Sequence, residues 1–245
     1  AIIFSLDYSF VFPAFLLSLF IKNFTIFLYS PRELTNPIKL VTLKIIRRKI
    51  TKVFVQTFYM KKLFEQKIEK KIPIIYVVPY LPNKEKFKPK EFSERNKKIY
   101  AYLSDASKQA GVYEIVALAK KFTDLTFFLA IRQFSMKEEK IFKNLIRFLE
   151  KEKLSNIKIF RNIEKVEQFL ISISGLINPL MDNENTMAFP LTIMECFLTK
   201  TPVFLRNLPV FSELSDFVIS FKNLEELFEI LADIGRYEEK IKLKT

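Results

Sequence analysis

The segment "NENTMAFPLTIMECFLTKTPVFL" at residues 183–205 predicts a helix followed by a short strand. Its apolar run "LTIMECFLTK" is typical of a buried helix, and "PVFL" at residues 202–205 is typical of a buried strand bounded by Pro. One acid, Glu195, lies inside the apolar run beside Cys196, the only cysteine of the chain. Because Glu is seldom buried unless it is paired, Glu195 is the first candidate for a functional role.

The same alternation of short apolar strands and helices extends to both sides of this segment. It includes a helix predicted at residues 12–21, with Pro13 in its first turn. Alternation of this kind predicts an α/β fold with parallel sheets covered by helices, in which ligands bind at the carboxyl ends of the strands. Strands are predicted at residues 2–6, 24–29, 52–57, 74–80, 99–104, 125–131, 157–160, 175–180 and 202–205.

A polar stretch that contains two prolines, "LPNKEKFKPKEFSERNKK" at residues 81–98, separates the two halves of the pattern. We place a domain boundary there, with domains at residues 1–92 and 93–245. The chain also starts, without Met, inside a predicted strand. We therefore expect residues before Ala1 to have been lost from a longer parent.

Composition excludes several classes of site. The chain has only 3 glycines, too few and too scattered for a G-x-G-x-x-G loop or a phosphate-binding P-loop. It has no His, which excludes a Ser-His-Asp triad, a Cys-His dyad and every His-based metal site. A single cysteine fits a reducing compartment or a cysteine-poor source. The absence of His and Trp, with abundant Lys, Ile and Phe, fits either codon bias or heat adaptation.

The net charge of +13 is concentrated at residues 39–71, where basic residues far outnumber acids. Within this segment Leu40, Leu43, Ile46 and Ile50 recur at helical spacing, which predicts an amphipathic helix with a basic face. Such a helix can lie on an anionic membrane surface or on a phosphate backbone, or its basic face can simply be solvated.

The apolar run "FVFPAFLLSLFI" at residues 10–21 is shorter than the roughly 20 residues that a membrane-spanning helix needs. No basic region precedes it and no small-residue cleavage site follows it, so it does not resemble a signal peptide. We therefore expect a cytoplasmic protein, at most peripheral on a membrane.

The order of these elements resembles that of the retaining glycosyltransferases of the GT-B fold, family four. The resemblance is carried by "IYAYLSDASKQAGVYEIVALAKKF", by "FPLTIMECFLTKTPVFL" and above all by "MEC-x-x-x-K-T-P-V". It covers the second domain well and the first half weakly. It implies two Rossmann-like domains, of which the first is reduced, a nucleotide-sugar donor on the second domain and an acceptor on the first. It also implies hexosyl transfer with retention and without a metal or other cofactor.

The resemblance also assigns residues to the donor site. Glu195 matches the second Glu of the family's paired-Glu motif, which accepts hydrogen bonds from the donor ribose, and two carboxylate oxygens suit a vicinal diol. Phe189 matches the motif's Phe. The turn from Ala188 to Leu191 precedes a helix N-terminus, where N–H groups favour a diphosphate. Pro190 stands where the family often has Gly and removes one N–H donor.

Departures from the family pattern concern charge. Met187 replaces the first Glu of the pair, which contacts the transferred sugar in relatives. In the opening loop Asp105 and Ala110 replace the family's Arg and Lys. We therefore expect Lys108, or Arg132 at the end of the next strand, to supply positive charge to the diphosphate.

Three further positions complete the candidate set. Gly111 serves the loop-to-helix turn, and Asn162, after the strand at residues 157–160, is a further donor-site candidate. Asp7 ends the first strand, where it either orients an acceptor hydroxyl or caps a loop. Cys196 is best interpreted as a small core residue.

Three functions remain open on the sequence alone. The first is a glycosyltransferase acting on an unknown acceptor, which is membrane-proximal if residues 39–71 bind a membrane. The second is a catalytically inactive relative that serves as a binding or structural partner, because Met187 and the missing Arg weaken the motif. The third, less favoured, is a nucleic-acid binder that uses residues 39–71, although no nucleic-acid module is recognisable.

Overall fold

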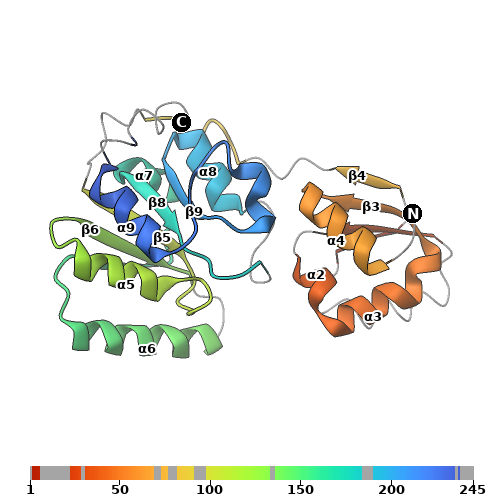
Figure 1. The fold of residues 1–245 in the computed structure, drawn as a ribbon, viewed down its shortest axis with the longest axis horizontal. Coiled ribbons are helices and arrows are strands. Elements are labelled where there is room, and N and C mark those ends of the chain that lie inside the picture. Colours follow the sequence, from red (N-terminus) through yellow and green to blue (C-terminus); the bar gives the residue numbers. More distant parts are fainter. Residues whose placement is uncertain are drawn as a thin grey trace. The chain divides into compact units, whose positions relative to one another are not determined.

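The computed structural model describes residues 2–5, 23–28, 31–68, 73–76, 82–90, 98–132, 136–183, 190–234 and 237. The chain forms two compact units (Figure 1). The first consists of Ala1–Tyr80, Asp182–Pro190 and Leu208–Glu213, and the second of Leu81–Met181, Leu191–Asn207 and Leu214–Thr245. The boundary predicted at residue 92 lies outside the described residues and stays a prediction.

The described strands of the first unit form a parallel sheet in the order β1-β2-β3-β4. Their positions agree with the sequence pattern, except that β3 begins two residues before the predicted strand at 52–57. The predicted helix at residues 12–21 lies outside the described residues. The strands are β1 (Ile2–Ser5), β2 (Phe24–Leu28), β3 (Ile50–Val55) and β4 (Ile74–Tyr76).

The described helices of the first unit are α2 (Arg32–Thr35), α3 (Pro37–Ile46) and α4 (Phe58–Ile68). Asn36 is the N-cap residue of α3. Its side-chain oxygen accepts hydrogen bonds from the N–H groups of Ile38 (3.1 Å) and Lys39 (3.2 Å). It ends in a 3-10 turn at Arg47–Lys49. The prediction that the amphipathic helix reaches Ile50 is wrong, because Ile50 is the first residue of strand β3, where its side chain is buried.

The second unit contains a six-stranded parallel sheet in the order β7-β6-β5-β8-β9-β10, counted over the described residues. In this order the first strand along the chain, β5, lies in the interior, and the direction of winding reverses between β5 and β8. This is the doubly wound arrangement of dinucleotide-binding folds, in which ligands bind at the reversal point. The strands are β5 (Ile99–Ser104), β6 (Thr126–Ile131), β7 (Ile157–Arg161), β8 (Gly175–Asn178), β9 (Val203–Arg206) and β10 (Ile219–Phe221).

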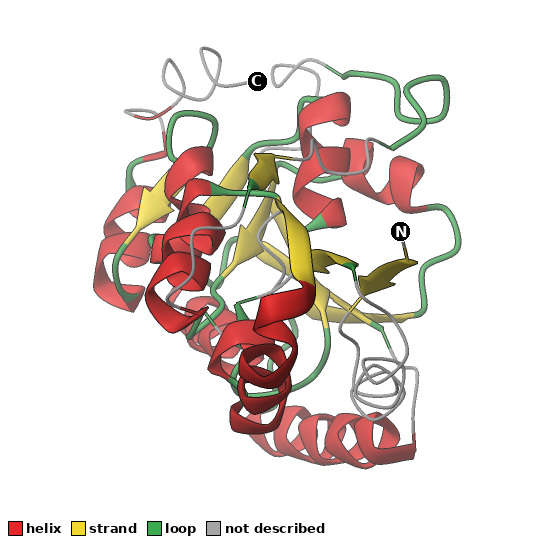
Figure 2. Ribbon diagram, turned by 90° about the vertical axis from the view of Figure 1, so that its right-hand side faces the viewer, coloured by secondary structure: helices red, strands yellow, loops and turns green. Residues whose placement is uncertain are grey.

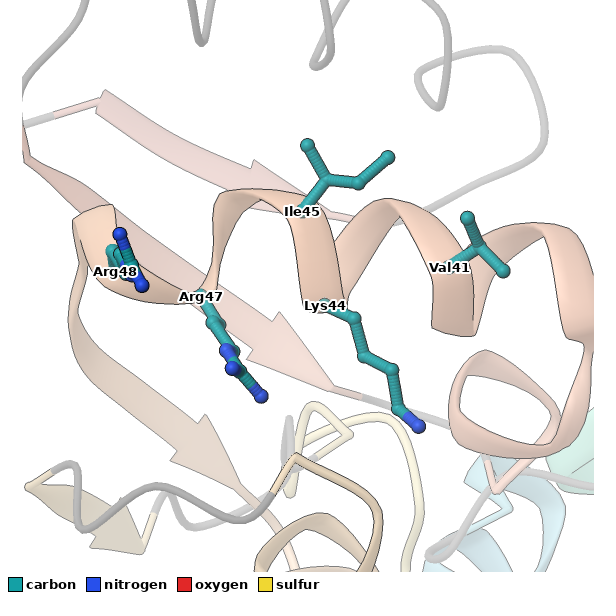
Figure 3. Close-up of a pocket in the computed structure, with 5 residues that line it drawn as sticks. All are labelled: Val41, Lys44, Ile45, Arg47 and Arg48. Atoms are coloured by element: carbon teal, nitrogen blue, oxygen red, sulfur yellow. The ribbon is translucent and has the colours of Figure 1, made fainter.

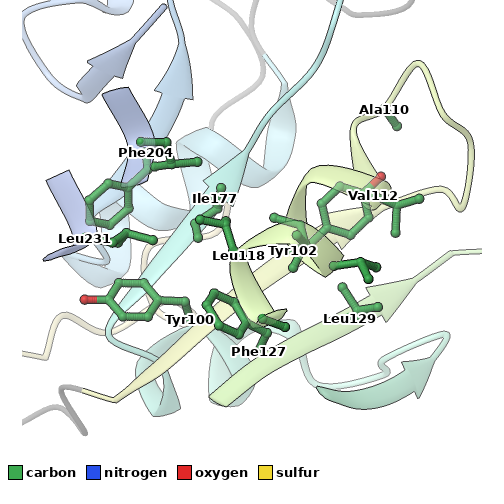
Figure 4. Packing of buried hydrophobic residues seen from close by; sticks show 14 of the residues in the cluster. Tyr100, Tyr102, Ala110, Val112, Leu118, Phe127, Leu129, Ile177, Phe204 and Leu231 are labelled. Atoms are coloured by element: carbon green, nitrogen blue, oxygen red, sulfur yellow. The ribbon is translucent and has the colours of Figure 1, made fainter. Parts of the chain in front are cut away.

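Figure 2 shows helices beside the strands of the chain, and in the second unit buried aromatic rings belong to the hydrophobic core. The Tyr100 ring packs edge-to-face on Phe204 with centroids 5.7 Å apart, and it also contacts Phe127 (Figure 4). The described helices are α5 (Val112–Lys121), α6 (Met136–Glu152), α7 (Val166–Ser172), α8 (Leu191–Thr199) and α9 (Leu224–Ala232). No helix within the described ranges has the length and apolar character that crossing a bilayer requires.

Candidate functional site

The loops that follow β5 and β8 are fastened together at the reversal point of the second sheet. Gly111 adopts a φ of +85°, and a Cβ there would lie 2.4 Å from the carbonyl oxygen of Pro179. The backbone N–H of Met181 donates a 2.9 Å hydrogen bond to the carbonyl oxygen of Gln109. Only a residue without a side chain fits at Gly111, so the loop-to-helix role predicted for it agrees with its conformation.

The loop between β5 and α5 is held by its own polar groups. The carboxylate of Asp105 accepts a 2.6 Å hydrogen bond from the N–H of Ser107, whose hydroxyl accepts one from the N–H of Ala110 (3.2 Å). The buried Tyr102 hydroxyl donates to the carbonyl oxygen of Asp105 at 2.5 Å. Asp105, at the position of the family's Arg, is therefore a turn-forming residue, and a cation for an anionic ligand has to come from another position.

Glu195 lies half-buried on α8, and the charges of two basic side chains and one acid act on its carboxyl group. Burial raises the pKa of its carboxyl group, whereas the positive charges of Arg132 and Lys86 lower it and Glu167 raises it again. Lys86 in turn forms an ion pair with Glu167 at 3.2 Å. The charge of Arg132 therefore acts on Glu195 in the folded chain, and both are predicted donor-site residues.

Arg132 directly follows β6, at the same edge of the sheet as the end of β5. Its backbone N–H donates to the carbonyl oxygen of Ser104 at 3.0 Å, and its charge also lowers the pKa of Tyr102, which burial raises above its ordinary value. Its side chain lines a small pocket of ≈ 20 Å³, enough for about one water molecule. Leu103, Ala130, Ile163 and Val166 form the other walls. Arg132 therefore supplies an exposed cation beside the reversal point.

Sequence reasoning did not include Lys86 in the site. The family that the chain resembles has an F-x-P linker that leads into its second domain. Phe87 and Pro89 match this linker directly after Lys86, which is the sequence signal for this position. Phe87 is buried, and the N–H of Lys90 donates to the carbonyl oxygen of Thr199 at the end of α8 (3.2 Å). The linker therefore packs on α8 and places Lys86 near Glu195.

Other predicted site residues occupy the carboxyl edge of the same sheet. Asn162 follows β7 with a φ of 49°, and its N–H donates to the carbonyl oxygen of Ile131 at 3.0 Å. Lys108 is exposed in the turn before α5, and Leu191 is exposed at the first position of α8.

Four residues of the sequence interpretation lie outside the described residues: Asp7, Met187, Ala188 and Phe189. Cys196, in contrast, is described and completely buried, which confirms its interpretation as a core residue.

A second ion pair lies at the same edge of the sheet. Arg206, the last residue of β9, pairs with Glu114 in the first turn of α5, and both side chains are mostly buried, with 13% and 15% exposed. Arg206 also donates to the carbonyl oxygen of Lys222 (3.2 Å) and lies over the Phe221 ring. Burial raises the pKa of Glu114 more than Arg206 lowers it. Arg206 is therefore engaged within the fold, which leaves Arg132 as the better placed cation for a ligand.

No protein-family model matches the sequence, and no curated protein matches it. Solved structures do match. The Anabaena protein Alr3699/HepE in complex with UDP has a TM-score of 0.75 and 16% identity over 96% of this chain and 70% of that one. Sucrose-phosphate synthase from Thermosynechococcus elongatus has a TM-score of 0.72 and 11% identity over 91% and 60%. A UDP-forming α,α-trehalose-phosphate synthase from Burkholderia xenovorans has a TM-score of 0.69 and 13% identity over 96% and 65%.

The chain thus spans 60% to 70% of the length of these proteins. At such low identity the likeness concerns architecture alone. Together with the parallel sheets of both units, it confirms the predicted fold class, so the chain has the GT-B fold of these glycosyltransferases.

Proposed function

We propose that this protein transfers a sugar from a nucleotide-sugar donor, bound by the second unit, to an acceptor held by the first. The observation that carries the proposal is that a half-buried carboxylate, Glu195, and an exposed guanidinium that acts on its charge, Arg132, both belong to the doubly wound unit, in which Arg132 directly follows β6 at the carboxyl edge of the sheet. The relative HepE was solved with UDP, with UDP-glucose, and with UDP and glucose. The ligands of this similar structure favour a nucleoside-diphosphate sugar as the donor.

Each residue has a proposed task in donor binding. The Glu195 carboxylate accepts hydrogen bonds from the two ribose hydroxyls, because its oxygens match a vicinal diol. Arg132 or Lys108 neutralises the diphosphate in place of a metal ion, and the turn that the sequence predicts from Ala188 through Phe189 to Leu191 cradles it.

Three supporting tasks complete the assignment. Gly111 keeps the loop after β5 close to the segment after β8, and Asn162 lines the donor site from the end of β7. Asp7 orients the acceptor hydroxyl. These tasks describe a hexosyltransferase that retains the configuration of the transferred sugar and needs no cofactor.

One observation favours a second candidate, a protein that binds the donor without turning it over. Asp105 stands at the position of the family's Arg, and its carboxylate is used to form the turn after β5. Met187 stands at the position of the first Glu of the motif. Both replacements remove groups that act on the transferred sugar or its diphosphate, whereas Glu195 is kept.

The test is a turnover assay with UDP, GDP, ADP and CDP sugars that measures nucleoside diphosphate released by hydrolysis or transfer. The proposal predicts release from one base class, lost in Glu195→Gln and retained in Glu229→Gln, an exposed acid on α9. Saturable binding of a donor without any release would support the second candidate. Neither binding nor release with any base would contradict both.

A further inference from the structure

Helix α3 of the first unit exposes a stripe of aliphatic side chains. Ile38, Val41 and Ile45 follow one another at spacings of three and four residues, which places them on one side of the helix. Their exposed fractions are 63%, 56% and 57%. The face that packs on the unit is a different one, on which Leu43 and Ile46 are buried. α3 therefore has two apolar faces, and among the residues that the structure describes only the face with Leu43 and Ile46 is covered.

Basic residues flank the exposed stripe. Lys44, Arg47 and Arg48 line a hollow of ≈ 490 Å³ together with Val41 and Ile45. Figure 3 shows the Val41 and Ile45 side chains projecting to one side of the helix, with Lys44 and Arg47 on the other. The surface named here the α3 surface consists of Ile38, Val41, Lys44, Ile45, Arg47 and Arg48.

Along the chain, the residues on either side of the α3 surface carry charge of a single sign. No Asp or Glu occurs anywhere from residue 34 to residue 64, whereas eight Lys and Arg residues do. A surface with this sign of charge attracts anions, and an exposed aliphatic stripe beside it is typical of an interaction site. A partner that matches both features is an anionic lipid surface. There, aliphatic side chains can insert between the headgroups and the acyl chains, and basic side chains can contact phosphates.

A nucleic acid fits the α3 surface less well. A phosphate backbone pairs with cations, but it offers nothing that would bury three aliphatic side chains side by side. We propose that the α3 surface docks the first unit on a membrane that contains anionic lipids. Ile38, Val41 and Ile45 insert between the headgroups, while Lys44, Arg47 and Arg48 contact lipid phosphates. The docking stands independently of the activity proposed above.

The test is cosedimentation of the full chain with vesicles of phosphatidylcholine alone and of an equal mixture of phosphatidylglycerol and phosphatidylcholine. Wild-type protein should sediment with the mixed vesicles and should be released by high salt. The apolar variant is Ile38→Ser/Val41→Ser/Ile45→Ser, which alters exposed positions only. The charge variant is Lys44→Gln/Arg47→Gln/Arg48→Gln. Its matched control, Lys140→Gln/Lys143→Gln/Arg147→Gln, removes the same charge from exposed positions of α6.

Each basic residue at an anionic surface is worth about fivefold in affinity, so the charge variant should bind on the order of a hundredfold more weakly than wild type. The apolar variant should lose about tenfold or more. The control should stay within about fivefold of wild type. Unchanged binding of the apolar variant would overturn the proposal, since the site would then be a general polyanion site. Tighter binding to duplex DNA than to mixed vesicles would overturn it as well.

Discussion

A side chain on Gly111 would collide with the backbone of Pro179, with only 2.4 Å between a Cβ and the carbonyl oxygen. This close approach joins the loop after β5 to the segment after β8, and the positive φ of Gly111 adds strain to any substitution there. The geometry of the candidate ligand edge therefore depends on a single glycine.

Gly111→Ala should destabilise the second unit by roughly 2–3 kcal/mol and should weaken binding of nucleoside diphosphates, because the loop has to move. Urea denaturation and nucleotide titration measure the two effects. The double variant Gly111→Ala/Pro179→Ala is the control for the source of the clash. It should be no more stable than Gly111→Ala, because the carbonyl oxygen remains. Full rescue by Pro179→Ala would show that the ring of Pro179 is the obstacle.

Glu195 should make stability depend on pH in a defined direction. Burial raises its pKa above the ordinary value of 4.5, so the folded protein binds this proton more tightly than the unfolded chain does. The stabilising contribution is complete below pH 4.5 and is lost as the pH rises through the pKa of the folded state. Glu195→Gln should therefore have a higher Tm than wild type at neutral pH, and the difference should vanish in acid.

Arg132→Gln should change the stability at neutral pH in the direction opposite to Glu195→Gln. Loss of the positive charge should raise the pKa of Glu195 further, so this variant should be less stable than wild type at neutral pH and equal to it in acid. Thermal unfolding across a series of pH values measures both variants. Parallel Tm curves for wild type and both variants would show that the two side chains do not interact.

The ion pair between Arg206 and Glu114 should behave as a coupled unit. Arg206→Gln leaves a mostly buried carboxylate without its partner and should cost roughly 2–3 kcal/mol of unfolding free energy. In Glu114→Gln/Arg206→Gln the uncompensated charge is gone, so the double variant should lose less than the sum of the single variants. Chemical denaturation of all four proteins gives the coupling energy. Strictly additive losses would contradict the pairing.

Asn156 fastens the end of α5 to the turn before β6. Its side-chain amide donates to the carbonyl oxygens of Ala119 (3.0 Å), Phe122 (2.9 Å) and Leu125 (3.0 Å). Asn156→Ala should cost about 1–3 kcal/mol, because partly buried carbonyl groups lose their donor. Asn156→Asp should cost more at neutral pH, since a carboxylate would face three acceptors, and part of the loss should be recovered in acid. Denaturation at both pH values tests this, and equal losses for the two variants would contradict it.

The parts of the fold that the sequence predicted are those with long apolar runs between clear boundaries. β5 was predicted to the residue, because a continuous apolar run lies between Lys98 and Asp105. β10 and α9 were not predicted. β10 has only 3 residues, which are too few to show a periodicity. At α9, the N-cap residue Asn223 accepts a 2.9 Å hydrogen bond from the N–H of Glu226. That capping pair was a usable signal.

The sequence names candidate site residues where motif and position agree, and their roles in ligand binding stay predictions. Glu195 and Arg132 are such candidates, and the effect of the Arg132 charge on Glu195 is recognisable only in the fold. Lys86 was missed because its position depends on how the linker packs on α8, which no local pattern records. On α3 the sequence pattern at Leu43 and Ile46 gave the buried face, whereas the exposed stripe is recognisable only once burial is known.

The central claim is that the second unit binds a nucleoside diphosphate through Glu195 and Arg132. Calorimetric titration of the full chain with UDP, GDP, ADP and CDP tests it most directly, with Arg147→Gln as the control for a lost surface charge on α6. We predict saturable binding of one nucleotide, weakened about tenfold or more in both Glu195→Gln and Arg132→Gln and unchanged in the control. Binding that is equally tight in wild type and in both variants would contradict the claim, as would no binding of any nucleotide.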